Sequence, residues 1–119
     1  MRDAASFAVL IAVVAGFMVW ASAFSTVYAL FSLGCAYGWE TPRPFGLPLW
    51  HAATAAGWLV HIIAHAALIA WTVRRFRARP ATEPDNRRFL QVSAVAIAVL
   101  GLVTTLWTGA PIVLLSTCA

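Results

Sequence analysis

Charged side chains are scarce in this sequence of 119 residues: they make up 10% of it, against 62% hydrophobic residues. A water-soluble domain needs about 25% charged residues to cover its surface, so most of this surface faces something other than water. Lysine is absent, and all eight basic residues are arginine. The net charge of +4 would suggest nucleic acid in a soluble protein. Because six arginines lie in one short segment, we instead expect a membrane-topology signal and no nucleic-acid partner.

Asp, Glu, Lys and Arg are missing altogether from three apolar runs, residues 7–33, 49–73 and 89–110. At about 1.5 Å per residue, each run is longer than the ~30 Å hydrocarbon core of a membrane. Only helices and closed barrels satisfy their backbone polar groups in lipid, and three long continuous runs exclude a barrel. The sequence therefore predicts an all-α membrane protein, a single domain of residues 1–119 with three transmembrane helices.

The two connections between these runs differ in charge. The segment 34–48 contains one arginine, Arg43, whereas the segment 74–88 contains Arg74, Arg75, Arg77, Arg79, Arg87 and Arg88. Arginine-rich connections stay on the cytoplasmic side of a membrane. We therefore expect the N-terminus in the cytoplasm, the 34–48 loop outside, and the C-terminus in the periplasm.

Cysteine occurs twice, as Cys35 and Cys118, and the predicted topology brings both to the periplasmic side. That compartment is oxidising, so two thiols there tend to form a disulfide. We expect a structural bond between them, since a redox-active pair usually lies closer in sequence. The alternative is two unrelated small residues on the same side.

Two histidines, His61 and His65, lie four residues apart in the middle of the second run. This spacing places them on one helix face, and imidazole is costly against lipid. We expect the face to contact another helix, of this chain or of a partner. It comprises Thr54, Trp58, His61, His65, Leu68 and Thr72.

The simplest role for these histidines is structural, with each neutral imidazole bonded to a hydroxyl on a neighbouring helix. Four hydroxyls lie at suitable depth: Ser22, Ser25, Thr104 and Thr105. A metal site is not expected, because zinc needs three or four ligands and the runs offer no Asp, Glu or Cys. A proton path would have to continue in a partner, since two histidines without an intramembrane carboxylate do not cross a membrane.

Ligation of a tetrapyrrole is the main functional alternative. His51 and His65 are separated by about 21 Å along a helix, which resembles the spacing with which one helix of a membrane cytochrome b serves two haems. The other two runs contain no histidine, so a bis-histidine haem within the monomer is excluded. One axial ligand, His61 or His65, would suffice for haem or bacteriochlorophyll, including in a site shared with a partner.

Small residues recur at intervals of four in all three runs, and such stripes let helices approach closely, within the chain or against a partner. They are Ala12, Gly16, Ala53, Gly57, Gly101, Thr105 and Gly109. Three helices cannot enclose a substrate path, and the sequence contains no nucleophile–base set or phosphate-binding loop. We therefore do not expect an enzyme.

Two segments, WASAFSTVYALFSLGCAYGW (20–39) and LWTGAPIVLLSTCA (106–119), carry a family resemblance in their aromatic residues, Pro111 and two cysteines. The chain resembles small three-helix inner-membrane proteins of Gram-negative bacteria that have no assigned activity and are often encoded beside haem-copper cytochrome c oxidase subunits. The resemblance implies a multi-pass protein of the bacterial inner membrane and supports the cysteine pairing. Such relatives carry histidines where this chain has Ala23 and Phe31, so no cofactor role carries over to those positions.

Together these features predict a non-catalytic accessory subunit of a larger electron-transport complex, of terminal-oxidase or photosynthetic reaction-centre type. Its contacts would be partner subunits and lipid. The alternative is a subunit that ligates haem or bacteriochlorophyll through His61 or His65. A third possibility is an assembly factor that leaves once the complex is built.

Overall fold

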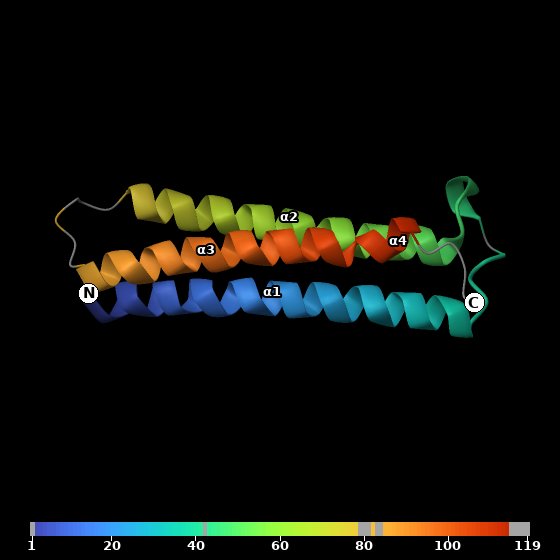
Figure 1. Ribbon diagram of the computed structural model, residues 1–119, viewed down its shortest axis with the longest axis horizontal. Helices are drawn as coiled ribbons and strands as arrows, with labels where there is room; N and C mark the ends of the chain where they lie inside the picture. Colours follow the sequence, from blue (N-terminus) through green and yellow to red (C-terminus); the bar gives the residue numbers. More distant parts are fainter. Residues whose placement is uncertain (1, 42, 79–81, 83–84, 115–119) are drawn as a thin grey trace.

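The computed structural model is a bundle of three long helices that lie side by side (Figure 1). The helices are α1 (Arg2–Ala36), α2 (Leu49–Arg77), α3 (Asp85–Thr108) and a short α4 (Ala110–Leu114), with one 3₁₀ turn, η1 (Pro44–Gly46), between α1 and α2. The structure describes residues 2–41, 43–78, 82 and 85–114, and side chains from residue 7 onward. This part of the chain contains no strand, and the bundle measures 60 × 21 × 21 Å.

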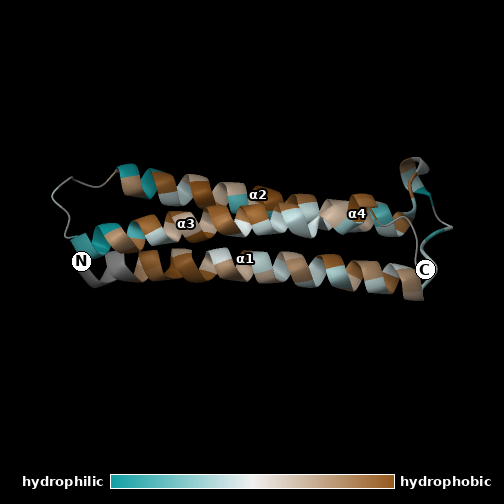
Figure 2. Ribbon diagram, viewed as in Figure 1, coloured by the Kyte–Doolittle hydropathy of each residue, from teal (hydrophilic) through white to brown (hydrophobic). Residues whose placement is uncertain are grey.

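Three segments are long and apolar enough to cross a membrane: Phe7–Ala36, Leu49–Arg77 and Asp85–Leu114. For the described residues this confirms the prediction of an all-helical protein in which three helices are long and apolar enough to span a membrane. Hydrophilic residues gather at the ends of α2 and α3 where the two are connected, and on the α1–α2 connection (Figure 2). The start of α1 lies at the same end as the α2–α3 connection (Figure 1). Which end faces the cytoplasm remains a prediction.

The helices are longer than the apolar runs that predicted them. We expected residues 74–88 to form a loop, but α2 continues to Arg77 and α3 begins at Asp85, so five arginines lie on helix ends. Arginine is a good helix former, and its long side chain lets the head group reach water while the backbone continues the helix. The bundle end that holds Arg74, Arg75, Arg77, Arg87 and Arg88 is called the arginine end below.

Small residues form the seam between α1 and α3. Ala12 and Gly16 on α1 and Ala94 and Ala98 on α3 are buried there, with Gly16 against Ala98 and with Ala12 and Ala94 lining one hollow. A Cβ atom on Gly16 would lie only 3.3 Å from Cγ2 of Ile97. Without a hydrophobic driving force in lipid, such close backbone approach is what gives membrane helices their van der Waals contact.

Bulky side chains of α2 pack against three other glycines: Gly34 faces Trp50, Gly101 faces His65, and Gly109 faces Trp58. An added Cβ atom would collide with the Cβ atom of Trp50 at Gly34 and with the indole ring of Trp58 at Gly109, and at Gly101 it would come within 2.8 Å of Cε1 of His65. The predicted stripe on the third run, Gly101, Thr105 and Gly109, thus faces α2. On α2, Gly57 faces Thr26 and Leu30 of α1, and Ala53 is half-buried.

Cys35 is half-buried in the last turn of α1. Cys118, its predicted partner, lies outside the described residues. The disulfide between them therefore stays a prediction.

Replacement of Ala98 by valine tests the small-residue seam. Ala98 is 1% exposed, so Ala98→Val inserts two methyl groups where α1 and α3 are in contact and should lower the free energy of unfolding by about 1–3 kcal/mol. The matched control is Ala96→Val, because Ala96 lies on the same helix but is exposed, and its effect should stay within about 0.5 kcal/mol. Unfolding of both variants would be followed by circular dichroism in detergent. Equal losses of stability would contradict a close-packed seam.

Candidate functional site: a histidine–hydroxyl layer inside the bundle

The α2 face that holds both histidines points into the bundle. Thr54, His65 and Thr72 are buried, while Trp58, His61 and Leu68 are half-buried. The face therefore contacts helices of this chain. Because α2 spans Leu49–Arg77, both histidines lie within about 3 Å of its midpoint along the axis.

His65 is completely buried, and its Nε2 atom lies 2.9 Å from Oγ1 of Thr105 on α3. Four other threonines donate their hydroxyl proton to the carbonyl four residues back in their own helix, namely Thr54, Thr72, Thr104 and Thr108. Thr105 instead directs its hydroxyl across to α2. Among the described residues the Thr105 hydroxyl has no other acceptor, so its proton is satisfied only if it donates to Nε2. We therefore assign Thr105 as the donor and place the ring proton of neutral His65 on Nδ1.

His61 bonds at both ring nitrogens. Nδ1 lies 2.7 Å from the carbonyl oxygen of Gly57 in its own helix, and Nε2 lies 3.0 Å from Oγ of Ser22 on α1. A carbonyl can only accept, so the ring proton belongs on Nδ1 and Nε2 accepts from Ser22. His61 therefore ties α2 to α1, as His65 ties α2 to α3.

Trp58 adds a third bond between helices. Its Nε1–H donates to the carbonyl oxygen of Thr105 over 2.7 Å. At the break between α3 and α4, the N–H of Gly109 donates to the carbonyl of Leu106, three residues back. Because Gly109 has no side chain, the Trp58 indole can lie against it and reach the Thr105 carbonyl. Thr105 thus holds α2 with both its hydroxyl and its carbonyl.

Two of the four candidate hydroxyls, Ser22 and Thr105, are the actual partners. Ser25 is exposed, and Thr104 donates to Leu100 of its own helix. Depth alone could not separate Thr104 from Thr105, because consecutive helical residues point about 100° apart. The third histidine, His51, lies away from this layer, where its ring contacts Trp50 with centroids 5.2 Å apart.

The two histidines differ as candidate tetrapyrrole ligands. His65 has no exposed surface and its Nε2 is engaged by Thr105, so it does not fit as an axial ligand in this arrangement. Nε2 of His61 is also engaged, by Ser22, but His61 is only half-buried and Ser22 is exposed. A carbonyl bond on Nδ1, as His61 makes to Gly57, is how ligating histidines are usually oriented. Among the described residues, no group of three His, Cys, Asp or Glu side chains could hold a metal ion.

Two buried polar atoms in the described residues have no hydrogen-bond partner: Nδ1 of His65 and Nε1 of Trp20. Trp20 lines a groove of about 270 Å³ between α1 and α3, together with Gly16, Phe17, Ile97, Leu100, Gly101 and Thr104. The sequence did not predict this groove, because nothing distinguishes Trp20 from the other aromatic residues of the apolar run. Only the packing of the helices shows that its indole N–H has no hydrogen-bond partner.

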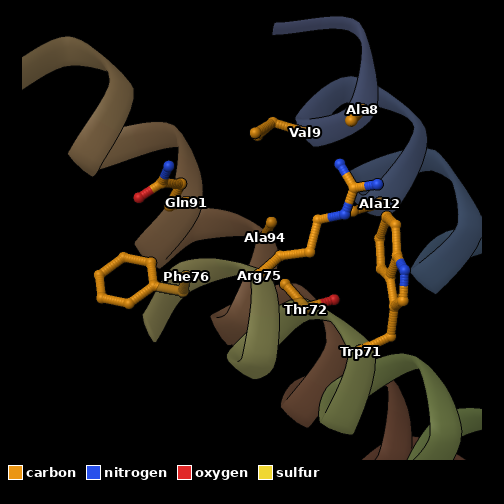
Figure 3. A pocket seen from close by; sticks show the side chains of 9 residues that line it. All are labelled: Ala8, Val9, Ala12, Trp71, Thr72, Arg75, Phe76, Gln91 and Ala94. Atoms are coloured by element: carbon orange, nitrogen blue, oxygen red, sulfur yellow. The ribbon is translucent and has the colours of Figure 1, made fainter. Parts of the chain in front are cut away.

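A second, smaller hollow, of about 20 Å³, lies at the arginine end (Figure 3). Arg75 extends from α2 toward α1, and its guanidinium lies 5.0 Å from the centre of the Trp71 ring. This is a cation–π contact, which holds the arginine head group at the edge of the bundle. Small side chains, Ala8, Ala12 and Ala94, form much of the wall.

No protein-family model, curated protein or solved structure matches this chain. We therefore infer its function from the arrangement of its own residues and from the motifs of segments 20–39 and 106–119.

Removal of the Thr105 hydroxyl tests the histidine layer. Thr105→Val keeps the shape of the side chain but leaves Nε2 of the buried His65 without a partner, which should lower the free energy of unfolding by about 1–2 kcal/mol. Thr104→Val is the matched control, since the Thr104 hydroxyl is exposed and bonds only within its own helix. Thermal unfolding of both variants in detergent measures the difference. If Thr105→Val is as stable as Thr104→Val, the layer does not hold the helices together.

Proposed function

We propose that this chain is a non-catalytic accessory subunit of a larger electron-transport complex in a bacterial inner membrane, of terminal-oxidase or reaction-centre type. The observation that carries the proposal is that polar side chains bond to one another inside the bundle, whereas aromatic side chains are exposed on its outside. Inside, both midplane histidines are bonded to hydroxyls of neighbouring helices. Outside, α1 presents an ordered row of aromatic rings.

The interior bonds support a structural role. Nε2 of each histidine, the usual site of acid–base or ligand chemistry, is occupied by Ser22 or Thr105. These bonds connect α2 to both other helices and fix their rotation. The polar side chains of the midplane therefore serve the bundle itself.

The aromatic ridge, defined as Phe17, Trp20, Phe24 and Tyr28, supports a docking role. Successive rings are in contact, with centroids 5.8, 6.3 and 4.6 Å apart. Phe17 and Tyr28 are 61% and 60% exposed. Because each ring restricts its neighbour, the ridge loses little side-chain entropy when another helix packs on it.

The electron-transport part of the proposal rests on the resemblance to small inner-membrane proteins encoded beside oxidase subunits. Three ridge residues, Trp20, Phe24 and Tyr28, lie in the 20–39 segment that carries this resemblance. The same residues thus support both the docking surface and the kind of partner.

Recovery of the complex tests this proposal. The tagged chain, extracted in mild detergent, should co-purify in stoichiometric amount with oxidase or reaction-centre subunits identified by mass spectrometry. The double variant Phe24→Ala/Tyr28→Ala should reduce that recovery at least about tenfold, because truncated aromatic anchors dominate the loss of interface energy. The control Val99→Ala/Val103→Ala changes two exposed residues of α3 instead. Recovery of the chain alone, or only as a homo-oligomer, would contradict the proposal, and substoichiometric recovery would indicate an assembly factor.

A haem- or bacteriochlorophyll-ligating subunit is the second candidate, and the orientation of His61 favours that residue over His65. In this case the purified chain or complex should show a visible absorption band. The band should disappear in His61→Ala and persist in His51→Ala, which changes the histidine outside the layer. A colourless preparation with full subunit content would exclude this candidate.

A further inference from the structure

The two unpaired polar atoms lie at the same seam of the bundle. The His65 ring, which comes from α2, lies directly behind Gly101: a Cβ atom on Gly101 would be 3.4 Å from Nδ1 of His65 and 3.5 Å from the carbonyl oxygen of Gly16. Trp20 lies one helical turn beyond Gly16 on α1. Gly16, Trp20 and Gly101 all line the groove between α1 and α3.

Both unpaired atoms are hydrogen-bond donors. The indole nitrogen of Trp20 can only donate. Nδ1 of His65 carries the ring proton in the tautomer assigned above, in which Nε2 accepts from Thr105. A buried donor without a partner costs about 1–3 kcal/mol. A bound molecule with acceptor oxygens would satisfy both donors at this seam.

Depth restricts the source of those oxygens. Trp20 lies about 2 Å from the midpoint of the Phe7–Ala36 span, and His65 about 3 Å from the midpoint of α2. The hydrocarbon core extends about 15 Å to either side of the midplane, so ester carbonyls of phospholipids stay far away. The acceptor has to belong to an apolar molecule that enters the core itself.

The groove is large enough for a single substituted six-membered ring. Its walls are Gly16, Phe17 and Trp20 on one side and Ile97, Leu100, Gly101 and Thr104 on the other. Its volume of about 270 Å³ lies just below the range of about 300–1,000 Å³ that encloses drug-sized ligands. A tetrapyrrole would not enter it, whereas a single substituted ring would. Leu100 and Phe17 are more than half exposed, so the groove opens onto the lipid side of the bundle.

We propose that the α1–α3 groove binds the head group of a membrane quinone, whose carbonyl oxygens accept hydrogen bonds from Trp20 Nε1 and His65 Nδ1. Both donors are covered in the closed seam, so α1 and α3 part slightly on binding. The proposal goes beyond the accessory role, since it concerns the isolated chain and needs no partner subunit.

Quinone titration of the purified chain tests this site. The full chain, labelled with ¹⁵N at its six tryptophans, is placed in lipid nanodiscs and titrated with a short-chain benzoquinone. The indole N–H resonance of Trp20, assigned by its loss in Trp20→Phe, should shift saturably, whereas that of Trp107, which is 80% exposed, should not. Trp20→Phe should weaken quinone binding about three- to tenfold, and the matched Trp107→Phe should leave it unchanged.

Three outcomes would overturn the proposal. The first is an unmoved Trp20 resonance in a chain that is folded by circular dichroism. The second is equal binding of an alkylbenzene without carbonyl groups, which would show that apolar contact alone fills the groove. The third is the same Trp20 shift when the chain is transferred from detergent to quinone-free nanodiscs, which would assign the site to lipid. Because the titration uses the isolated chain, its failure is independent of any failure to recover a complex.

Discussion

The bundle depends on one constraint: polar side chains near the middle of a membrane cannot bond to water and must find partners within the protein. His61 and Trp58 meet this requirement by bonding to Ser22 and Thr105 on the neighbouring helices, and His65 meets it at Nε2, by its bond to Thr105. Their bonds set the rotation of α2 relative to α1 and α3. Since leucine-like surfaces are no more attracted to one another than to lipid, these few polar bonds specify which helix faces meet.

Glycine makes this arrangement possible. The rings of α2 are large, and two of them, His65 and Trp58, occupy the places where side chains of residues 101 and 109 would otherwise lie. Gly109 has a second effect, because α3 breaks there and the Thr105 carbonyl becomes the acceptor of the Trp58 indole. The polar bonds thus depend on the small residues, because the glycines leave the space that the rings need in order to reach their hydrogen-bond partners.

The sequence was sufficient for the three spans, for the α2 face that contacts another helix and for a short set of candidate hydroxyls, because all of these follow from apolar length and helical periodicity. It left open whether that face contacts this chain or a partner. It could not choose Ser22 over Ser25 or Thr105 over Thr104, since that choice depends on the rotation of one helix against another. Helix ends were also missed, because arginines such as Arg74 and Arg88 leave the hydrocarbon without ending the helix. The unpaired Trp20 N–H has no sequence signal, because it follows from packing alone.

The central claim is that the bond between His65 and Thr105 holds α2 to α3, and a double-mutant cycle tests it most directly. The free energy of unfolding would be measured in detergent for the wild type, His65→Phe, Thr105→Val and the double variant. The account predicts a coupling free energy of about 0.5–2 kcal/mol, with the double variant less destabilised than the sum of the single variants. Additive losses, with no coupling, would contradict it.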